Sequence, residues 1–270
     1  MTRPMQLTAS DGARVEIHPI GAQVGSWIPA GGVEQFFTAS NAPVGSAAFK
    51  GGIPVCFPQF ASQGPLPPHG FARDQTWTPA DRGSDGSDAW AIWTLRDAGS
   101  MSSRWPHKFE VDLKVTIGGA RIDTAMTVRN PASRAWFFTG ALHTYFGVDD
   151  IDDVSVTGLN GLEYIDKTKD NARARHGDEP LRVPAETDRV YLGARMPLTL
   201  RDGRRSLDIA ARGFPDVVIW NPWKGASERF PQLGPEDYRR MICIEAAVAL
   251  HPVSLEEGQN WTGAQTVTVR

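Results

Sequence analysis

Alternation of apolar and polar residues is clearest in the middle of the chain, where it predicts an antiparallel hairpin. Apolar side chains occupy every second position through 109–117, the period of a strand that buries one face. Gly118 and Gly119 follow, and the alternation resumes from Ile122 to Val128. Glycines between two alternating segments are typical of a tight turn that joins antiparallel strands. We therefore predict that these two segments pair with each other.

Other short segments, rich in β-branched and aromatic residues, predict further strands. They are 14–18, 89–96, 136–141, 206–211, 216–220, 241–245 and 265–270. No segment keeps a 3.6-residue apolar period for three turns, and helices do not alternate with strands as a parallel sheet requires. The 27 glycines and 20 prolines divide the chain into short elements. We predict an all-β fold, a large antiparallel β-sandwich or barrel with few, short helices.

Two strongly polar stretches, 81–88 and 166–179, are predicted to be surface loops. No change in composition marks a linker, and no internal repeat or low-complexity tract is present. A chain of 270 residues is long enough for two small domains, but sandwiches and barrels of this size often form one. We therefore expect a single domain over residues 1–270.

Composition and charge are those of an ordinary water-soluble protein. Hydrophobic residues make up 41% of the chain and the formal net charge is −3, so no overall positive field attracts nucleic acid. Residues 1–10 lack the apolar core of a secretion signal, and Glu245 interrupts the longest apolar stretch, 241–250. The two cysteines, Cys56 and Cys243, are too few for a disulfide framework. We expect a cytoplasmic protein that binds no membrane.

The segment 50–73 is rich in glycine and proline and carries three basic side chains, Lys50, His69 and Arg73. Backbone N–H groups of a rigid glycine-containing loop, together with converging cations, form an anion-binding arrangement. A structured loop with solvated charges is the alternative. These residues alone do not decide between the two.

Two ionisable residues lie in strongly apolar surroundings. Glu245 is the only charge in 241–247, and His143 ends an apolar run. Because desolvation makes a buried, unpaired carboxylate costly, Glu245 either pairs with a cation or serves as a base whose pKa is raised. A histidine flanked by apolar residues is usually a core or turn residue. A functional role for His143 is therefore indicated only in combination with other candidate residues. With His69 the two would resemble a metal-binding set, but no closely spaced ligand pair supports one.

Asp188 and two tryptophans are less distinctive candidates. For Asp188 the alternative is a salt bridge or a turn cap. Trp220 and Trp223 are suited to stack against a sugar ring, although core packing explains them equally well. Neither a GxSxG motif nor a reactive-cysteine signature supports nucleophilic hydrolysis.

In combination, these motifs resemble the glucose-6-phosphate 1-epimerases, the hexose-6-phosphate mutarotases of the aldose 1-epimerase superfamily. The resemblance is carried by KGGIPVCFPQF from residue 50, PHGFAR from 68, LHTYF from 142, TDRVY from 187, VIWNPW from 218 and CIEAA from 243. The motifs occur in the family's order over nearly the whole chain, and their combination is specific. The resemblance implies a galactose-mutarotase-like β-sandwich.

The resemblance also implies residue roles. It makes His143 and Glu245 the catalytic pair and puts His69 beside the substrate. It places Asp188 on a sugar hydroxyl and Arg73 near the phosphate of the substrate, a small sugar phosphate.

Two positions depart from the family pattern. Lys50 stands where arginine is usual, which keeps the charge but loses the bidentate fork that suits phosphate oxygens. Pro68 stands where glutamine is usual, so one side-chain amide is missing. Both changes concern ligand binding and leave the proposed acid and base intact.

Interconversion of α and β anomers needs a base and an acid at one carbon. Glu245 as a carboxylate would accept the proton of the C1 hydroxyl, while His143 as an imidazolium would protonate the ring oxygen. This chemistry requires no cofactor or metal, and we expect a monomer. The alternatives are a mutarotase for neutral aldoses, a carbohydrate-binding protein without turnover, and a glycoside hydrolase that uses two carboxylates.

Overall fold

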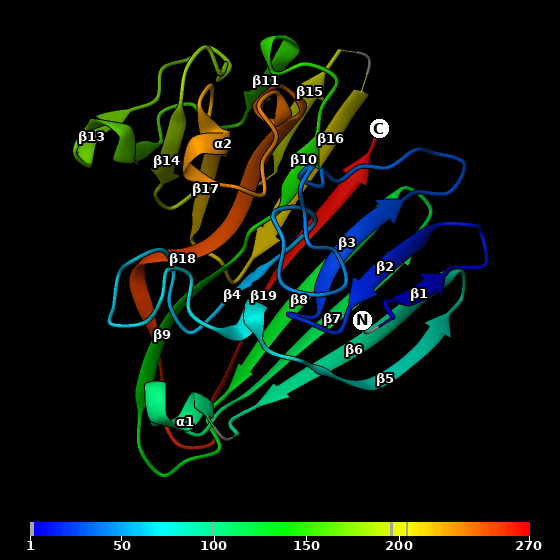
Figure 1. Cartoon of the computed structure of the whole chain (residues 1–270), viewed down its shortest axis with the longest axis vertical. Coiled ribbons are helices and arrows are strands. Elements are labelled where there is room, and N and C mark those ends of the chain that lie inside the picture. The colour runs from blue at the N-terminus through cyan, green and yellow to red at the C-terminus, as the bar shows by residue number, and fades with distance from the viewer. Residues whose placement is uncertain (1–2, 99, 195–196, 204) are drawn as a thin grey trace.

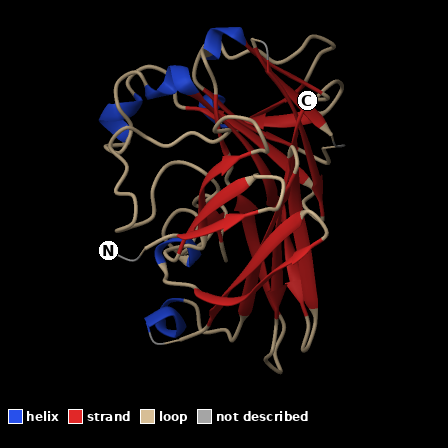
Figure 2. Ribbon diagram, turned by 90° about the vertical axis from the view of Figure 1, so that its right-hand side faces the viewer, coloured by secondary structure: helices blue, strands red, loops and turns tan. Residues whose placement is uncertain are grey.

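The computed structural model describes residues 3–98, 100–194, 197–203 and 205–270, and antiparallel strands predominate in it. These residues form two eight-stranded sheets and one three-stranded sheet. Figure 2 shows the helices as short segments beside the strands. The predicted all-β architecture of large antiparallel sheets with few, short helices is confirmed. Within the described ranges, no helix is long and apolar enough to cross a membrane.

The first large sheet, called here the β18 sheet, has the strand order β13-β12-β14-β17-β18-β9-β4, with β10 also paired to β18. Its central strand β18 (Met241–Leu255) pairs with β17 along one edge and with β9 and β10 along the other (Figure 1). The other strands are β4 (Val55–Cys56), β9 (Trp136–Leu142), β10 (Tyr145–Gly147), β12 (Glu163–Asp166), β13 (Ala172–Arg175), β14 (Thr187–Tyr191) and β17 (Asp216–Asn221).

The second large sheet contains the predicted hairpin. Strands β7 (Glu110–Gly118) and β8 (Arg121–Arg129) pair antiparallel up to Gly118 and Arg121, so the turn consists of Gly119 and Ala120. Gly119 has a φ of +57°, which a glycine adopts without steric cost. The hairpin prediction is confirmed. The sheet's other strands are β5 (Thr78–Asp85), β6 (Asp88–Arg96), β11 (Val154–Thr157), β15 (Leu198–Asp202), β16 (Arg205–Arg212) and β19 (Asn260–Val269).

The smaller elements complete the architecture. The three-stranded sheet lies at the N-terminal end of the chain and consists of β1 (Met5–Thr8), β2 (Arg14–His18) and β3 (Gln23–Ile28). The short helices are η1 (Ala72–Asp74), α1 (Ser100–Arg104), η2 (Ile151–Asp153), η3 (Lys167–Lys169), α2 (Ala226–Arg229) and η4 (Asp237–Arg240). All seven additional segments predicted as strands fall on strands; β18 continues ten residues beyond the predicted end, and β19 ends one residue before it.

The prediction that the two polar stretches are loops is wrong, because each includes an edge strand. Strand β5 covers most of 81–88 and pairs with β6, whereas β13 and η3 lie within 166–179. All residues of β5 except Gly83 are exposed, and so are all four residues of β13. A strand with neither face buried has no apolar alternation, so its sequence does not distinguish it from a loop.

A shared hydrophobic core joins the three sheets. Its largest cluster includes Ile17 of β2, Val115 of β7 and Ile244 of β18. Strand β18 is buried along its first nine residues, on both faces. Glu245 lies within that stretch, so the fold itself removes its carboxylate from bulk water.

Candidate active site

Five of the six residues singled out from the sequence line one pocket of about 180 Å³. This cavity, called here the His143 pocket, is lined by Lys50, His69, His143, Asp188 and Glu245, among others. Arg73, the sixth, lines a neighbouring cavity of about 160 Å³, the Arg73 pocket. Lys50 and His143 line both cavities. The structure therefore gathers all six residues at one location, in two pockets that share a wall.

Glu245 and His143 form a close pair at the base of this site. Oε1 of Glu245 lies 3.4 Å from Nε2 of His143. Glu245 is held by strand pairing opposite Val218 of β17, and 2% of its surface is exposed. Its second oxygen, Oε2, is buried and has no hydrogen-bond partner within the described residues. A buried, unsatisfied carboxyl oxygen beside a cavity is a group that a ligand hydroxyl would satisfy.

His143 follows β9 directly and is fixed by its backbone and its ring. Its N–H donates to the carbonyl of Pro54 at 3.0 Å. The imidazole stacks on the ring of Tyr145, with centroids 4.7 Å apart and planes 9° from parallel. Trp220 meets the same imidazole edge-on at 6.0 Å. These contacts leave the ring little freedom to turn away from Glu245.

The electrostatics of the pair favour its neutral form. Burial raises the pKa of Glu245 well above its ordinary value, and the charge of Lys167 partly opposes that rise. Burial lowers the pKa of His143 well below its ordinary value, and the neighbouring His69 and the charges of Lys50 and Arg73 lower it further. Both directions favour a proton on the carboxyl and a neutral imidazole. This differs from the carboxylate and imidazolium expected from sequence, but the two forms hold the same single proton and differ only in its position.

His69 is held by an unusual backbone. Its φ of +70° lies in the left-handed region, and its N–H donates to the carbonyl of Ala61 at 2.9 Å. A non-glycine residue in this region is strained, and such strain is common at functional sites. Burial, assisted by the charges of Arg73 and Lys167, lowers the pKa of His69 to about 3. The side chain is therefore neutral near pH 7.

Lys50 and Arg73 bring positive charge to the wall between the two pockets. The ammonium group of Lys50 lies 4.3 Å from the ring centroid of Phe230 and 5.4 Å from that of Trp220, within the range of cation–π attraction. Nη2 of Arg73 donates to the carbonyl oxygen of Pro68 at 2.9 Å. Pro68, which lacks the expected glutamine amide, thus contributes a backbone carbonyl that orients Arg73.

Lys167 is a pocket residue that the sequence did not reveal. It belongs to a stretch predicted to be a surface loop, yet it lines the His143 pocket. Its Nζ lies 3.7 Å from Oδ1 of Asp188 and 4.8 Å from the ring centroid of Phe60. The sequence offers one indication of local structure near Lys167, namely Asp166. Its Oδ1 accepts the N–H of Thr168 at 3.1 Å and caps the turn. A cap of this kind fixes a turn but does not say where the turn lies.

The aromatic candidates divide between the site and the core. Trp220 lines the His143 pocket, opposite Asp188 in the strand register. Trp223 lines neither cavity of the site and packs on Tyr238, with centroids 5.3 Å apart. Of the two tryptophans, Trp220 alone is positioned to contact a ligand in these cavities.

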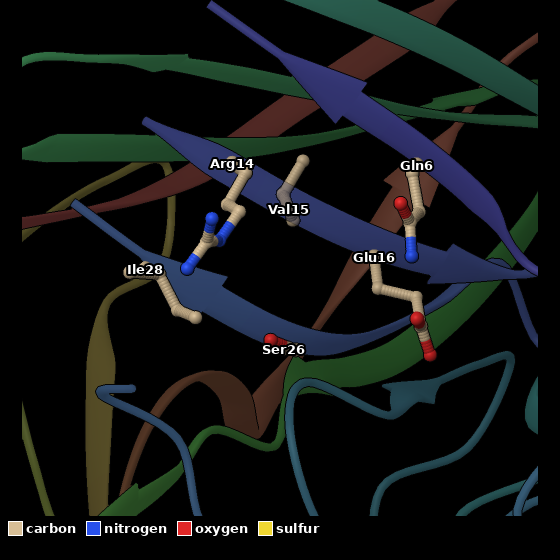
Figure 3. A pocket seen from close by; sticks show the side chains of 6 residues that line it. All are labelled: Gln6, Arg14, Val15, Glu16, Ser26 and Ile28. Carbon is tan, nitrogen blue, oxygen red and sulfur yellow. The ribbon is translucent and has the colours of Figure 1, made fainter. Parts of the chain in front are cut away.

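A separate hollow on the three-stranded sheet contains none of the six candidate residues. Its lining side chains come from β1, β2 and β3 (Figure 3) and are Gln6, Arg14, Val15, Glu16, Ser26 and Ile28. Glu16 contacts Nε2 of the buried His18 at 3.0 Å. His18, to which the sequence assigned no role, packs edge-on against Phe49 at 5.2 Å. The histidine thereby supports the residue that precedes Lys50.

Comparison with known proteins identifies the family. Residues 4–268 match the family described as aldose 1-epimerase. The chain belongs to the aldose 1-epimerase family. It is thus an isomerase, of the epimerase or mutarotase type, which confirms the class of enzyme predicted from the motifs.

Individual relatives agree with this assignment. A protein of Cenchrus ciliaris named "Putative glucose-6-phosphate 1-epimerase" is 35% identical over 260 residues, which cover 92% of this chain and 79% of the relative. A protein of the same name from Salmonella typhimurium is 31% identical and covers 92% of this chain and 84% of its own length. A crystal structure of a "putative mutarotase" from Salmonella typhimurium superimposes with a TM-score of 0.88 at 29% identity, over 95% of this chain and 87% of that one. The galactose-mutarotase-like sandwich implied by the resemblance is confirmed.

Proposed function

We propose that this member of the aldose 1-epimerase family interconverts the α and β anomers of a hexose 6-phosphate, with glucose 6-phosphate as the first candidate. The observation that carries the proposal is the buried pair of Glu245 and His143, 3.4 Å apart, beside the cations Lys50 and Arg73. The names of two relatives support the choice of substrate.

Ring opening uses the pair as base and acid. The carboxylate of Glu245 accepts the proton of the C1 hydroxyl, and the C1–O1 bond becomes a carbonyl as the bond from C1 to the ring oxygen breaks. The electron pair of the broken bond takes up the proton of the His143 imidazolium. After this step Glu245 is protonated, His143 is neutral and the sugar is an open-chain aldehyde.

Ring closure reverses both transfers. Rotation about the C1–C2 bond presents the other face of the carbonyl, His143 removes the proton from the former ring oxygen, and Glu245 returns its proton to O1. The neutral pair that burial favours is the state that the residues have while the sugar is open. Because both states hold one proton, a full cycle exchanges none with solvent.

The remaining residues bind and orient the sugar. Lys50 and Arg73 neutralise the phosphate at the Arg73 pocket, while Asp188 and His69 hold oxygens of the ring in the His143 pocket. Holding the ring while C1 rotates is a positioning effect. The buried cysteines Cys56 and Cys243, which form no disulfide, and the core shared by all three sheets support a single-domain enzyme of the cytoplasm.

Anomer exchange measured by NMR tests the proposal. Saturation transfer between the α and β C1 protons is compared for glucose 6-phosphate, glucose and galactose. Acceleration restricted to the phosphate ester is the expected result. Faster exchange of the free sugars alone would instead identify a mutarotase for neutral aldoses, and no acceleration of any sugar would support a binding protein without turnover.

Substitution of Arg73 by alanine tests the phosphate assignment. Hydrogen bonds to a charged group contribute roughly 1.5–3 kcal/mol, so kcat/KM for glucose 6-phosphate is expected to fall by about 10- to 100-fold. Any residual rate with free glucose should change by less than about 3-fold, because no phosphate contact is lost. Arg82→Ala, at an exposed position of β5, is the control. Equal losses for both sugars would refute the assignment.

The pH profile of kcat tests the charge around Glu245. Activity requires one proton on the pair, so the acid limb marks a second proton on His143 and should lie below pH 6.5, the ordinary value for histidine. The alkaline limb marks loss of the last proton. Lys167 lowers the pKa of Glu245, so Lys167→Met should move the alkaline limb to higher pH. The control is Lys169→Met, at an exposed position nearby, which should not change the pH of the alkaline limb. A shift of that limb to lower pH in Lys167→Met would contradict the mechanism with one shared proton.

A further inference from the structure

A buried thiol contacts the rear of the substrate-binding histidine. Sγ of Cys56 lies 3.2 Å from Nδ1 of His69, within hydrogen-bond distance for sulfur. We propose that Cys56 is a positioning residue that fixes the tautomer of His69, so that Nδ1 accepts and Nε2–H is the donor available to the sugar. The proposal deepens the proposed function and rests on His69 contacting the substrate.

The direction of the hydrogen bond follows from the protonation of both partners. Burial raises the pKa of the Cys56 thiol, so sulfur keeps its hydrogen. His69 is neutral because its pKa is about 3. A neutral imidazole has one N–H and one lone pair, and its nitrogen is a far better acceptor than sulfur. The thiol therefore donates to Nδ1, and the ring proton resides on Nε2.

Among the described residues, the contact with His69 is the only hydrogen bond of Cys56 Sγ. The thiol therefore has no competing acceptor there. The reverse arrangement, with Nδ1–H donating to sulfur, would leave the thiol hydrogen without an acceptor in a fully buried position. A buried donor without a partner is destabilising, which favours the thiol as donor.

The backbone holds the two residues side by side. Cys56 is paired to Ala141 in the strand register of β4 and β9. The next residue, Phe57, forms a bridge with Gly70, which follows His69. The carbonyl of Phe57 also accepts the N–H of Phe71 at 3.0 Å. The contact between sulfur and imidazole is thus built from both sides of the bridge and does not depend on one flexible side chain.

The consequence is a division of roles between the two histidines of the pocket, whose ring centroids lie 5.4 Å apart. His69 with a fixed Nε2–H binds an oxygen lone pair and is not a proton acceptor at that nitrogen. His143 has no such partner on Nδ1 within the described residues and is left to exchange protons. The Nδ1–H tautomer of His69 would instead direct the lone pair of Nε2 at the sugar. That lone pair would repel a sugar oxygen that needs a hydrogen-bond donor.

The first test is ¹⁵N NMR of the full chain labelled in histidine, with the His69 signals assigned by their loss in His69→Gln. Wild type is expected to have His69 as the Nε2–H tautomer at pH 7. In Cys56→Ala the ring should become a mixture of both tautomers, whereas Cys56→Ser, which restores a donor, should return it to Nε2–H. Cys243→Ala, the other buried cysteine, is the control and should leave the His69 signals unchanged.

Kinetics of the same variants supply the second readout. Loss of one neutral hydrogen bond should raise KM for glucose 6-phosphate by about 3- to 10-fold in Cys56→Ala, with a smaller change in kcat, and Cys56→Ser should reverse most of the rise. An Nδ1–H tautomer in wild type, or an unchanged tautomer in Cys56→Ala, would overturn the proposal. The NMR measurement needs no turnover, so absence of anomer exchange would count against the proposed function without affecting the tautomer result. If Cys56→Ala does not fold, the wild-type tautomer and Cys56→Ser still decide.

Discussion

Replacing Glu245 with glutamine is expected to lower kcat for anomer exchange by about 10²- to 10⁴-fold, the usual contribution of a positioned acid or base. Glutamine keeps the shape of the side chain and is neutral, as burial already favours for Glu245. It cannot accept the proton of the C1 hydroxyl, and it removes the single proton that the pair with His143 shares. KM should change little, because the groups that bind the sugar are intact.

The measurement is saturation transfer at several enzyme concentrations, with the uncatalysed exchange subtracted. Glu257→Gln, an exposed glutamate beyond the end of β18, is the matched control and should retain the wild-type rate. Binding of glucose 6-phosphate by the Glu245 variant is followed separately by calorimetry. A rate within a few-fold of wild type would falsify the assignment of Glu245 as the base.

Substitution of Gly52 by alanine is expected to lower the free energy of unfolding by about 3 kcal/mol or more. Gly52 has a φ of +54°, and a Cβ built there would overlap the carbonyl oxygen of Val24. That oxygen accepts the N–H of Ile53 at 2.8 Å, so it cannot move away without breaking a hydrogen bond. Because the atoms nearest to the added Cβ are backbone atoms of Val24 and Gly25, no rotation of a side chain relieves the overlap.

Gly31→Ala separates the two causes of this effect. Gly31 has a φ of +66° but no atom within 4 Å of an added Cβ, so it is subject to conformational strain alone. Its expected loss is about 1 kcal/mol. Denaturant unfolding of both variants measures the difference. Similar losses in the two would mean that the close approach to Val24 is relieved elsewhere in the chain.

The fold was largely predictable because most strands bury one face. Alternation is a direct consequence of that burial, and it identified β7 and β8 with the turn between them. Strands β5 and β13 lie at sheet edges with exposed side chains on both faces, so no pattern marks them. Their polar composition made the prediction of loops reasonable and wrong.

The sequence allowed the candidate site residues to be identified but not the contacts between them. Glu245 is conspicuous because a charge in an apolar strand requires an explanation, whereas His143 became credible only with partners. The 3.4 Å between them arises from the order of β9, β10 and β18 in the sheet, which no local pattern contains. Lys167 reaches the pocket through the pairing of β12 with β14, and its own neighbours in the sequence resemble any charged surface segment.

The proposed catalytic pair and the basic side chains of this site lie in different kinds of structural element. Glu245 lies within β18 and His143 between β9 and β10, whereas Lys50, Arg73 and Lys167 lie in connections and short helices outside the strands. Substitutions in those connections disturb few of the hydrogen bonds between strands. Substitution of these basic side chains would therefore change which sugars bind while leaving the proposed acid and base in place. Reaction and substrate choice would then evolve at different rates in this architecture.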